Sequence, residues 1–285
     1  MFSKVSVVPY SGKTLRSHLA TRFRLIEQLF EPNPRNPNHA HSNAYLEVTL
    51  EGGYILYRGQ KAQTCQPWTI LYHPAGEVHS NSVPSTGVRI LIIEIASQEL
   101  SWIRGCCRIA EDSLSFEGGE PAWFAARLYR EFKHSDEVSP LVIEGLVLEL
   151  LADIFRRQAQ KSPKGVPEWL SHANELIQTK FAEKITLADI AGQVGIHPVH
   201  LAKEYRRRYK LTVGHQIRQL RIDYASKQIM ETDLSLVNIA LASGFSDQSH
   251  FTVAFKNFMG TTPSAYRCIS RETNSLLKNT DPLQL

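Results

Sequence analysis

Three histidines and one glutamate in the first third of the chain have the types and spacing of a ligand-binding cluster. His39 and His41 are separated by one residue, and Glu47 follows six residues later. If residues 39–47 form one β-strand, these three side chains share a face, because neighbouring residues of a strand point to opposite faces. His79 follows a proline-glycine turn and can join them from another strand. Three imidazoles and a carboxylate form a ligand set that suits Zn, Fe, Mn or Ni.

Strand alternation by itself leaves three interpretations of this cluster open. The polar side chains are hydrogen-bonded parts of the fold, or they line an effector pocket without a metal, or they hold one transition metal. The metal interpretation uses His39, His41, Glu47 and His79. The effector interpretation uses His39, His41, Tyr45, Tyr57 and His79. The pattern does not distinguish a metal from an anionic ligand, so the cofactor stays undetermined, with one transition metal as the candidate.

A second set of candidate residues lies in a repeat of 49–50 residues in the C-terminal part. Residues 187–213 and 236–263 share their apolar positions and one glycine, which is Gly195 in the first unit and Gly244 in the second. Each unit is typical of a short helix, a glycine turn and a second helix, which is the helix-turn-helix arrangement. The matched residues are Leu187, Ile190, Ala191, Ile196, Leu201, Tyr205 and Thr212 with Leu236, Ile239, Ala240, Phe245, Phe251, Phe255 and Thr262.

The second helix of each unit, called the reading helix below, is predicted to present a polar face outward. At 100° per residue, one side of each helix is apolar and buried. The buried residues are Leu201 and Tyr205 in the first reading helix, and Phe251, Phe255 and Phe258 in the second. The outward residues are Val199, Lys203, Arg206 and Arg207 in the first, and Ser249, Val253 and Lys256 in the second. Such side chains read base edges in the major groove of DNA, while neighbouring cations bind phosphates.

Spacing and charge agree with a polyanion as the partner. Val213 to Met230 reads as one helix of roughly 27 Å, close to the ~34 Å between major-groove openings on one side of DNA. The net charge of +4 is concentrated, because residues 184–271 hold 12 basic and 6 acidic side chains. Such an excess suits phosphate contacts. Paired helical units also build protein-binding bundles, which is the alternative interpretation.

The elements that position these residues fall into two regimes. Residues 44–95 show strands broken by turns, with a hairpin signal at Gly52-Gly53, and predict an antiparallel sandwich or barrel. Helices are predicted from about Glu120 to His134 and again after Ser139-Pro140. The second helix has one apolar stripe, which packs on its own barrel or pairs with a second subunit. The stripe consists of Ile143, Leu146, Val147, Leu150, Leu151, Ile154 and Phe155.

Composition limits the class of protein further. The chain of 285 residues with 42% hydrophobic residues is long enough for one or two cored domains, and no apolar run reaches the roughly 20 residues of a membrane span. The N-terminus lacks the apolar segment of a secretory signal. Cys65, Cys106, Cys107 and Cys268 fit neither a disulfide framework nor a paired metal site, so we expect free thiols in the cytoplasm.

The C-terminal part resembles a known family in a specific run of residues. That run is Ala240-Leu-Ala-Ser-Gly-Phe-Ser-Asp-Gln-Ser-His-Phe-Thr-Val-Ala-Phe-Lys-Asn-Phe-Met-Gly-Thr-Thr-Pro-Ser-Ala-Tyr-Arg267. It resembles the signature of AraC/XylS-family transcription regulators, and the resemblance covers about residues 167–268. It implies a seven-helix domain that binds double-stranded DNA through two helix-turn-helix units, usually in an activator. The DNA contacts that it implies are His197, Val199, His200, Lys203 and Arg207 in the first unit, and Gln248, Ser249, His250 and Lys256 in the second. The outward face of the first reading helix adds Arg206 to these candidates.

Four residues depart from the family pattern. Val253 stands where the family usually has an Arg that contacts DNA, which implies weaker base reading by the second unit. Lys210 and Val213 replace the usual Gly and Pro after the first reading helix, and His197 replaces a capping Ser. These three bear on local geometry and leave the fold unchanged.

The histidine cluster is similar to the two cupin motifs, and AraC-type regulators often carry a cupin-like N-terminal domain that binds an effector. We therefore predict an α+β chain with an antiparallel cupin-like β-barrel and flanking helices, followed by an all-α domain with two helix-turn-helix units. The expected limits are 1–157 for effector binding and dimerisation, 158–167 for a linker, 168–270 for DNA binding, and 271–285 for a disordered tail.

The expected protein is a cytoplasmic transcription regulator with no membrane segment and no catalytic residues. Its expected partners are double-stranded DNA, a small-molecule effector, a second copy of the chain and RNA polymerase. The alternative is a metal-dependent cupin enzyme that its C-terminal domain tethers to DNA.

Overall fold

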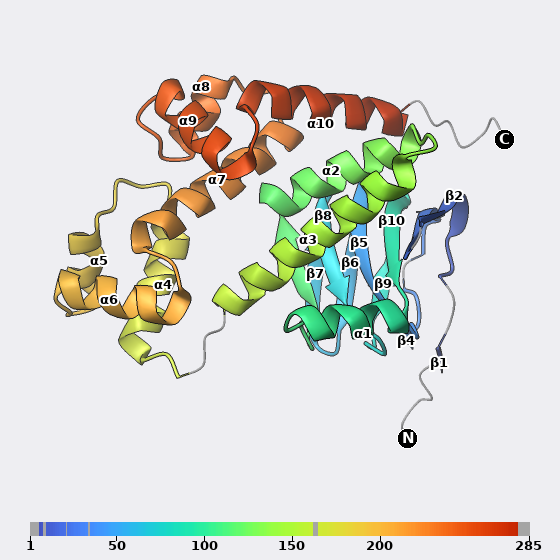
Figure 1. The fold of residues 1–285 in the computed structure, drawn as a ribbon, viewed down its shortest axis with the longest axis horizontal. Coiled ribbons are helices and arrows are strands. Elements are labelled where there is room, and N and C mark those ends of the chain that lie inside the picture. Colours follow the sequence, from blue (N-terminus) through green and yellow to red (C-terminus); the bar gives the residue numbers. More distant parts are fainter. Residues whose placement is uncertain (1–5, 8–9, 21, 34, 162–164, 279–285) are drawn as a thin grey trace. The chain divides into compact units, whose positions relative to one another are not determined.

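The computed structural model describes residues 6–7, 10–20, 22–33, 35–161 and 165–278 (Figure 1). These residues form two compact units, which are described one at a time. The first unit draws on the segments Met1–Glu117, Phe124–Phe155 and Glu272–Leu285. The second draws on Gly118–Trp123 and Arg156–Arg271. None of the helices among the described residues is long and apolar enough to cross a membrane.

The first unit is built on antiparallel β-structure. Its largest sheet has six strands in the order β11-β8-β5-β10-β3-β2, and a second sheet has the order β7-β6-β9. The six strands are β11 (Leu114–Glu117), β8 (Thr69–His73), β5 (Ala44–Gly52), β10 (Val88–Ile95), β3 (Phe23–Phe30) and β2 (Lys13–Ala20). The three strands are β7 (Lys61–Cys65), β6 (Tyr54–Arg58) and β9 (Ser80–Ser82). A short parallel pair joins β1 (Ser6–Val7) to β4 (His39–Ala40).

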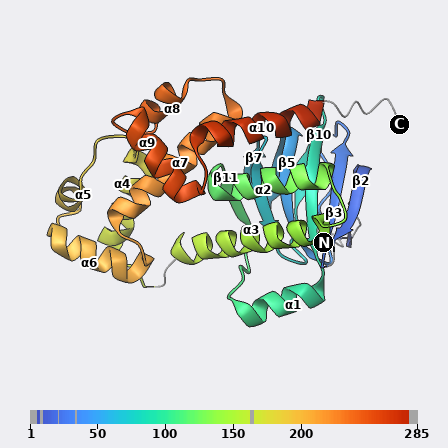
Figure 2. The ribbon, with the colours of Figure 1, turned by 45° about the horizontal axis from the view of Figure 1, so that its top comes forward.

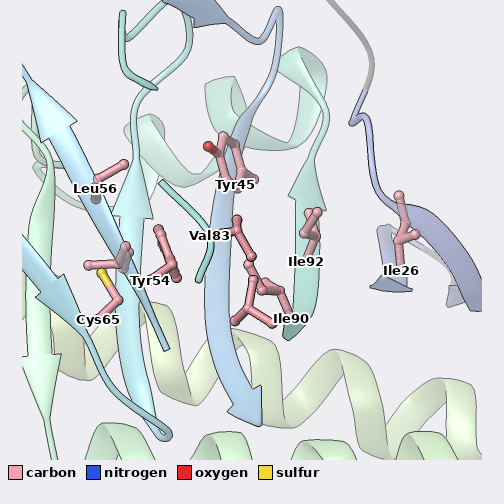
Figure 3. Packing of buried hydrophobic residues seen from close by; sticks show 10 residues of the cluster. Ile26, Tyr45, Tyr54, Leu56, Cys65, Val83, Ile90 and Ile92 are labelled. Carbon is pink, nitrogen blue, oxygen red and sulfur yellow. The ribbon is translucent and has the colours of Figure 1, made fainter. Parts of the chain in front are cut away.

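The core of this unit lies among the strands of the two sheets. Figure 3 shows side chains from β3, β5, β6, β7 and β10 packed together. The cluster consists of Ile26, Tyr45, Tyr54, Leu56, Cys65, Leu71, Val83, Val88, Ile90 and Ile92, each at most 4% exposed. Most of these residues are β-branched or aromatic, and such side chains suit a pleated, buried surface. The antiparallel fold predicted for residues 44–95 is therefore confirmed.

The predicted hairpin at Gly52-Gly53 is wrong, although a turn does lie there. β5 pairs with β10 and β8, whereas β6 pairs with β7 and β9, so the chain changes sheets at this turn. Gly52 has a positive φ of 75°, and a Cβ there would lie 2.5 Å from the carbonyl oxygen of Gly87. The glycine therefore permits a close approach between backbone segments, which a two-residue hairpin signal does not reveal.

Helices α1 (Ser97–Cys106), α2 (Gly119–Lys133) and α3 (Ser139–Lys161) follow the strands. Figure 2 shows α2 and α3 running side by side along the sheet. All seven residues of the predicted apolar stripe on α3 are buried within this chain. Phe155 meets Tyr72 of β8 edge to face, with 5.2 Å between ring centroids. The stripe thus packs on its own sheet, as the first of its two interpretations requires.

Residues 39–47 do not form one strand, because the chain breaks between β4 and β5. The backbone carbonyl of His41 accepts a hydrogen bond of 2.9 Å from the amide of Gly76, which diverts the chain before Ala44. Two other limits also differ from expectation. α3 continues to Lys161, so the expected linker begins with helix, and residues 162–164 lie outside the described part.

The expected disordered tail is wrong for residues 271–278, which are helical. α10 spans Pro263–Lys278, and its buried face extends past residue 270. Tyr266, Ser270 and Thr273 recur at helical spacing and are all buried. Spacings of three and four residues place side chains on one face of a helix. Residues 279–285 lie outside the described part.

From Glu168 to Arg271, the described residues of the second unit form helices α4 to α9 and the first part of α10. The bounds of the others are α4 (Glu168–Lys180), α5 (Leu187–Gln193), α6 (Pro198–Tyr209), α7 (Val213–Glu231), α8 (Leu236–Ala242) and α9 (Gln248–Met259). The turns between α5 and α6 and between α8 and α9 hold Gly195 and Gly244, both with positive φ. The α+β fold with a helix-turn-helix C-terminal part is confirmed.

Side-chain caps define where these helices begin. Thr186 and Asp189 form a reciprocal capping box at α5, and Ser235 and Asp247 cap α8 and α9. His197 caps α6 through Nδ1, which accepts a hydrogen bond from the amide of Val199. The imidazole therefore fills the capping role that the resemblance gives to a serine.

Candidate functional site

The reading helices are α6 and α9, and each buries one face in the second unit. Leu201, Tyr205 and Tyr209 of α6 are buried, and the Tyr205 hydroxyl donates a 2.7 Å hydrogen bond to Asn174 of α4. Phe251 and Phe255 of α9 are fully buried, whereas Phe258 is only half-buried. These contacts determine which side of each helix faces solvent.

All ten side chains predicted as DNA contacts are exposed. They are His197, Val199, His200, Lys203, Arg206, Arg207, Gln248, Ser249, His250 and Lys256. Two valines also lie on the outward faces of these helices, Val199 at 69% exposure and Val253 at 61%. Apolar side chains at such positions can contact the methyl group of thymine.

One of the cations of α6, Arg207, forms an ion pair within the helix. Glu204 accepts hydrogen bonds from Nε and Nη2 of Arg207 at 3.1 and 2.5 Å, and these bonds lower the pKa of the Glu204 carboxyl. Within the described part of the chain, Lys203 and Arg206 make no ion pair. Helix α9 carries one cation, Lys256, so α6 presents most of the positive charge of the two reading helices.

A hollow of about 630 Å³ lies between α6 and the beginning of α7. Its lining includes Lys203, Arg206 and Arg207 on one side and Thr212, Val213 and Gly214 on the other. Thr212 caps α7, whose free amides give this helix end a partial positive charge. The hollow is therefore positively charged on both sides.

Lys210, at a φ of 62°, takes the left-handed conformation that Gly260 takes after α9.

A second candidate site lies in the first unit, where His39, His41 and His79 converge. The ring centroids are 4.4 Å apart for His39 and His79, 5.2 Å for His39 and His41, and 5.5 Å for His41 and His79. One ring nitrogen from each of the three lies within 4.8 Å of the other two. The spacing of the three histidines therefore did predict side chains that the fold brings together.

Backbone carbonyls orient two of these rings. Nδ1 of His39 lies 2.9 Å from the carbonyl oxygen of Pro37, and Nδ1 of His79 lies 3.2 Å from that of Glu77. A carbonyl oxygen accepts only, so each Nδ1 carries the proton and each Nε2 keeps its lone pair. The Tyr45 hydroxyl lies 3.3 Å from Nε2 of His79.

Glu47 does not join the three histidines, so this part of the predicted cluster is wrong. Its carboxylate accepts a hydrogen bond from the Tyr54 hydroxyl and lies 3.9 Å from Nε2 of His73. Burial raises the pKa of Glu47 above its ordinary value, and nearby His73 opposes that shift. The reason is the break after His41, because β5 starts a new alternation.

Tyr45 belongs to the cluster, and Tyr57 does not reach it by any contact among the described residues. The Tyr45 ring stacks on His73 at 4.5 Å and meets His41 at 5.2 Å. Tyr57 lies on β6 opposite Ser80. Of the five residues predicted for an effector pocket, the fold brings together His39, His41, Tyr45 and His79. Tyr57 lies apart from them.

Sequence reasoning missed three residues around this site. His73, at the end of β8, is fully buried and bonds through Nδ1 to Glu77 at 2.5 Å. His73, Glu77 and His79 form a second group of possible metal ligands. The Tyr10 ring lies 4.5 Å from that of His41. A histidine at the end of an apolar strand was the available signal for His73, whereas no local pattern marks Tyr10.

Burial of His79 predicts that the first unit loses stability in mild acid. Desolvation and the neighbouring histidines lower the pKa of His79 to about 2, whereas an unfolded histidine titrates near 6.5. Between these values the unfolded chain binds the extra proton, so stability falls as the pH falls below about 6.5. We expect a loss of about 1–2 kcal/mol from pH 7 to pH 5, measured by urea denaturation of metal-free protein. The His79→Gln variant should lose less over the same range, and an equal loss would contradict this account.

Comparison with known proteins identifies the second unit. A family model described as a helix-turn-helix domain matches residues 190–268. A putative AraC-like transcription regulator from Streptomyces lividans is 29% identical over 157 residues, which are 51% of this chain and 50% of that protein. The transcriptional activator AarP from Providencia stuartii is 34% identical over 101 residues, which are 35% of this chain and 75% of AarP. The chain belongs to the AraC family of transcription regulators. It spans about half the length of the Streptomyces relative.

Solved structures of other AraC-family proteins are also similar. The C-terminal domain of AraT from Geobacillus stearothermophilus has a TM-score of 0.36 at 26% identity, over 37% of this chain and 88% of that one. ToxT from Vibrio cholerae has a TM-score of 0.35 at 16% identity, over 87% of this chain and 98% of ToxT. In this AraC-family chain, all ten predicted DNA-contact residues lie within the matched helix-turn-helix segment.

Proposed function

We propose that this AraC-family chain is a sequence-specific DNA-binding transcription regulator, in the sense of an activator, that responds to a small ligand in its first unit. The observation that carries the DNA-binding part is the pair of reading helices, α6 and α9, whose predicted contact residues are all exposed. A major groove admits one α-helix, so each unit suits one groove.

The length of α7 supports binding of both helices to one side of a duplex. Its 19 residues, Val213–Glu231, correspond to about 28 Å at 1.5 Å per residue. Successive major-groove openings on one side lie ~34 Å apart. The cations of α6, three of which line the hollow beside α7, are available to phosphates next to the groove.

Replacing Lys203 by alanine tests this interface. Lys203 is exposed on α6, and we expect DNA binding to weaken by about 1–3 kcal/mol, which is about 5- to 150-fold in Kd. The measurement is fluorescence anisotropy with a duplex that the wild-type protein selects from a random pool, repeated at several salt concentrations. The weaker salt dependence of the variant should show the loss of a phosphate or base contact.

Lys61→Ala is the matched control, because it removes the same charge from an exposed position on β7 in the other unit. Its Kd for the selected duplex should equal that of the wild type. Binding by Lys203→Ala as tight as wild type, or binding by wild type without salt dependence, would contradict the assignment of α6.

The histidine cluster supports a ligand site in the part of the chain that we assign to residues 1–157, with DNA binding in residues 168–270. A ligand alters DNA occupancy only if it binds two arrangements of the protein with different affinity. A homodimer and a contact with RNA polymerase complete the proposal, which places the protein in the cytoplasm with its DNA. Because α3 buries its apolar stripe within the chain, the dimer requires another surface, and Leu141 at 73% exposure offers one at the start of α3.

One observation also favours the alternative of a metal-dependent enzyme that the second unit tethers to DNA. Three histidines that leave a coordination position open are the ligands of some catalytic zinc sites. Turnover of a small substrate that is lost in His79→Ala would support that alternative over a regulator.

A further inference from the structure

We propose that the ligand of the first unit is a divalent transition metal ion, bound by one ring nitrogen from each of His39, His41 and His79. The binding site stands on the geometry of the first unit alone. Its role as a regulatory input rests on the proposed function of the chain.

The three nitrogens are close to the spacing that such an ion requires. One ligand atom from each histidine lies within 4.8 Å of the others. Nitrogens bound tetrahedrally at about 2.0–2.1 Å from zinc lie about 3.3 Å apart. Rotations that move each ring by about an ångström therefore bring the three together, and the three residues come from neighbouring backbone, since His39 and His79 form a β-bridge.

The orientation of the rings is the stronger evidence. Metal-binding histidines usually donate their other ring N–H to a carbonyl or carboxylate, which fixes the tautomer. His39 and His79 both have Nδ1 at a backbone carbonyl, Pro37 and Glu77 respectively. Nε2 of each histidine therefore keeps its lone pair, and an ion bound by His79 takes the place of the Tyr45 hydroxyl, which lies 3.3 Å from that Nε2.

The surrounding charges favour an ion of the nitrogen-binding class. The nearby carboxylates have other partners: Glu47 bonds to Tyr54, and Glu77 bonds to His73 and Ser113 and lies 3.6 Å from Arg58. Three imidazoles without a carboxylate suit Zn, Ni, Cu or Co, whereas Mg and Ca require oxygen ligands. The same residues argue against an anionic ligand, because Arg58 is already paired with Glu77.

The site leaves room for a fourth ligand. His39 is half-buried, whereas His41 and His79 are 8% and 5% exposed, so the open side lies toward His39. Three protein ligands with an open position allow water or a small chelating molecule to complete the coordination. The ion itself, or the molecule bound to it, is then the signal.

The test is a titration of the full chain, stripped of metal, with Co(II) and with Zn(II). We expect one Co(II) per chain with visible d–d absorption bands of a nitrogen-rich site, displaced by Zn(II). Loss of a residue that only supports a metal ligand weakens metal binding by about 10- to 100-fold. We expect His41→Ala to weaken Co(II) binding by more than that, because it removes a ligand itself. His134→Ala removes an exposed histidine from the end of α2 and should bind like wild type.

Circular dichroism shows whether each variant is folded, so a loss of binding is not mistaken for unfolding. A wild-type chain without these absorption bands, or a His41→Ala chain that binds Co(II) as tightly as wild type, would overturn the site.

The regulatory role has a separate readout. Zn(II) is expected to change the Kd of wild-type protein for its selected duplex and to leave that of His41→Ala unchanged. If Zn(II) binds the first unit while the Kd for DNA stays constant, the ion is not the effector. If the protein binds no selected duplex either with or without Zn(II), the DNA-binding proposal fails by itself, and the Co(II) titration still decides the site.

Discussion

Replacing Glu27 by alanine is expected to lower the free energy of unfolding by about 3–5 kcal/mol, the cost of breaking a buried ion pair. Glu27 lies on β3 and is fully buried. Its carboxylate accepts a hydrogen bond of 2.9 Å from Tyr129, lies 3.3 Å from Nζ of Lys133 and lies 3.8 Å from Nη1 of Arg89. Alanine would leave two cationic side chains in the interior without the carboxylate between them.

Urea denaturation measures this loss, and Glu51→Ala is the matched control. Glu51 also pairs with Arg89, at 3.5 Å, but its side chain is 54% exposed. Exposed ion pairs contribute about 0–1 kcal/mol, so the control should stay within that range. Equal losses for the two variants would show that burial of the carboxylate has no special role.

Gly244→Ala is expected to destabilise the second unit by about 2–5 kcal/mol and to abolish DNA binding with it. Gly244 has a φ of 82°, which costs an L-residue about 1–2 kcal/mol. A Cβ there would also lie 2.4 Å from the carbonyl oxygen of Ala182, and such overpacking adds about 1–3 kcal/mol. The contact is with backbone, so no side-chain rotation relieves it.

The other unit of the repeat supplies the control for this change. Gly195 has a φ of 69°, but a Cβ there would meet nothing within 4 Å. Gly195→Ala should therefore show only the conformational cost of about 1–2 kcal/mol. The difference between the two variants isolates the packing against Ala182. Thermal or urea unfolding with equal losses for both would refute that explanation.

This pair also shows how far the repeat could be predicted. The matched glycines and apolar positions identified two helix-turn-helix units, because both signals are local in the sequence. The exposed side of each reading helix followed from the same periodicity, and all ten predicted contact residues are exposed. The two glycines differ in their surroundings, because Gly244 lies against the backbone of Ala182 whereas Gly195 has open space around it. This difference depends on tertiary packing, which the repeat does not encode.

For the first unit, the sequence predicted the type of secondary structure correctly but not which strands pair with one another. Strand composition and turns indicated antiparallel β-structure correctly. The turn at Gly52-Gly53 was misjudged because pairing partners are chosen over long distances: β5 pairs with β10, whose residues lie about forty positions further along the chain. The extent of α10 was misjudged for a related reason, since its polar composition concealed a buried face at Ser270 and Thr273.

The sequence by itself determined the helix-turn-helix repeat and the outward basic residues of α6, because periodicity and local turns decide these features. It also named His39, His41 and His79 as candidates, but a β-bridge between two distant segments brings them together. Only the tertiary structure decided that Glu47 turns to Tyr54 and His73, that His73 and Tyr10 surround the histidine cluster, and that Glu27 joins β3 to α2. The physical reason is that buried polar groups must find partners where the chain places them, and those partners come from segments that are distant in sequence.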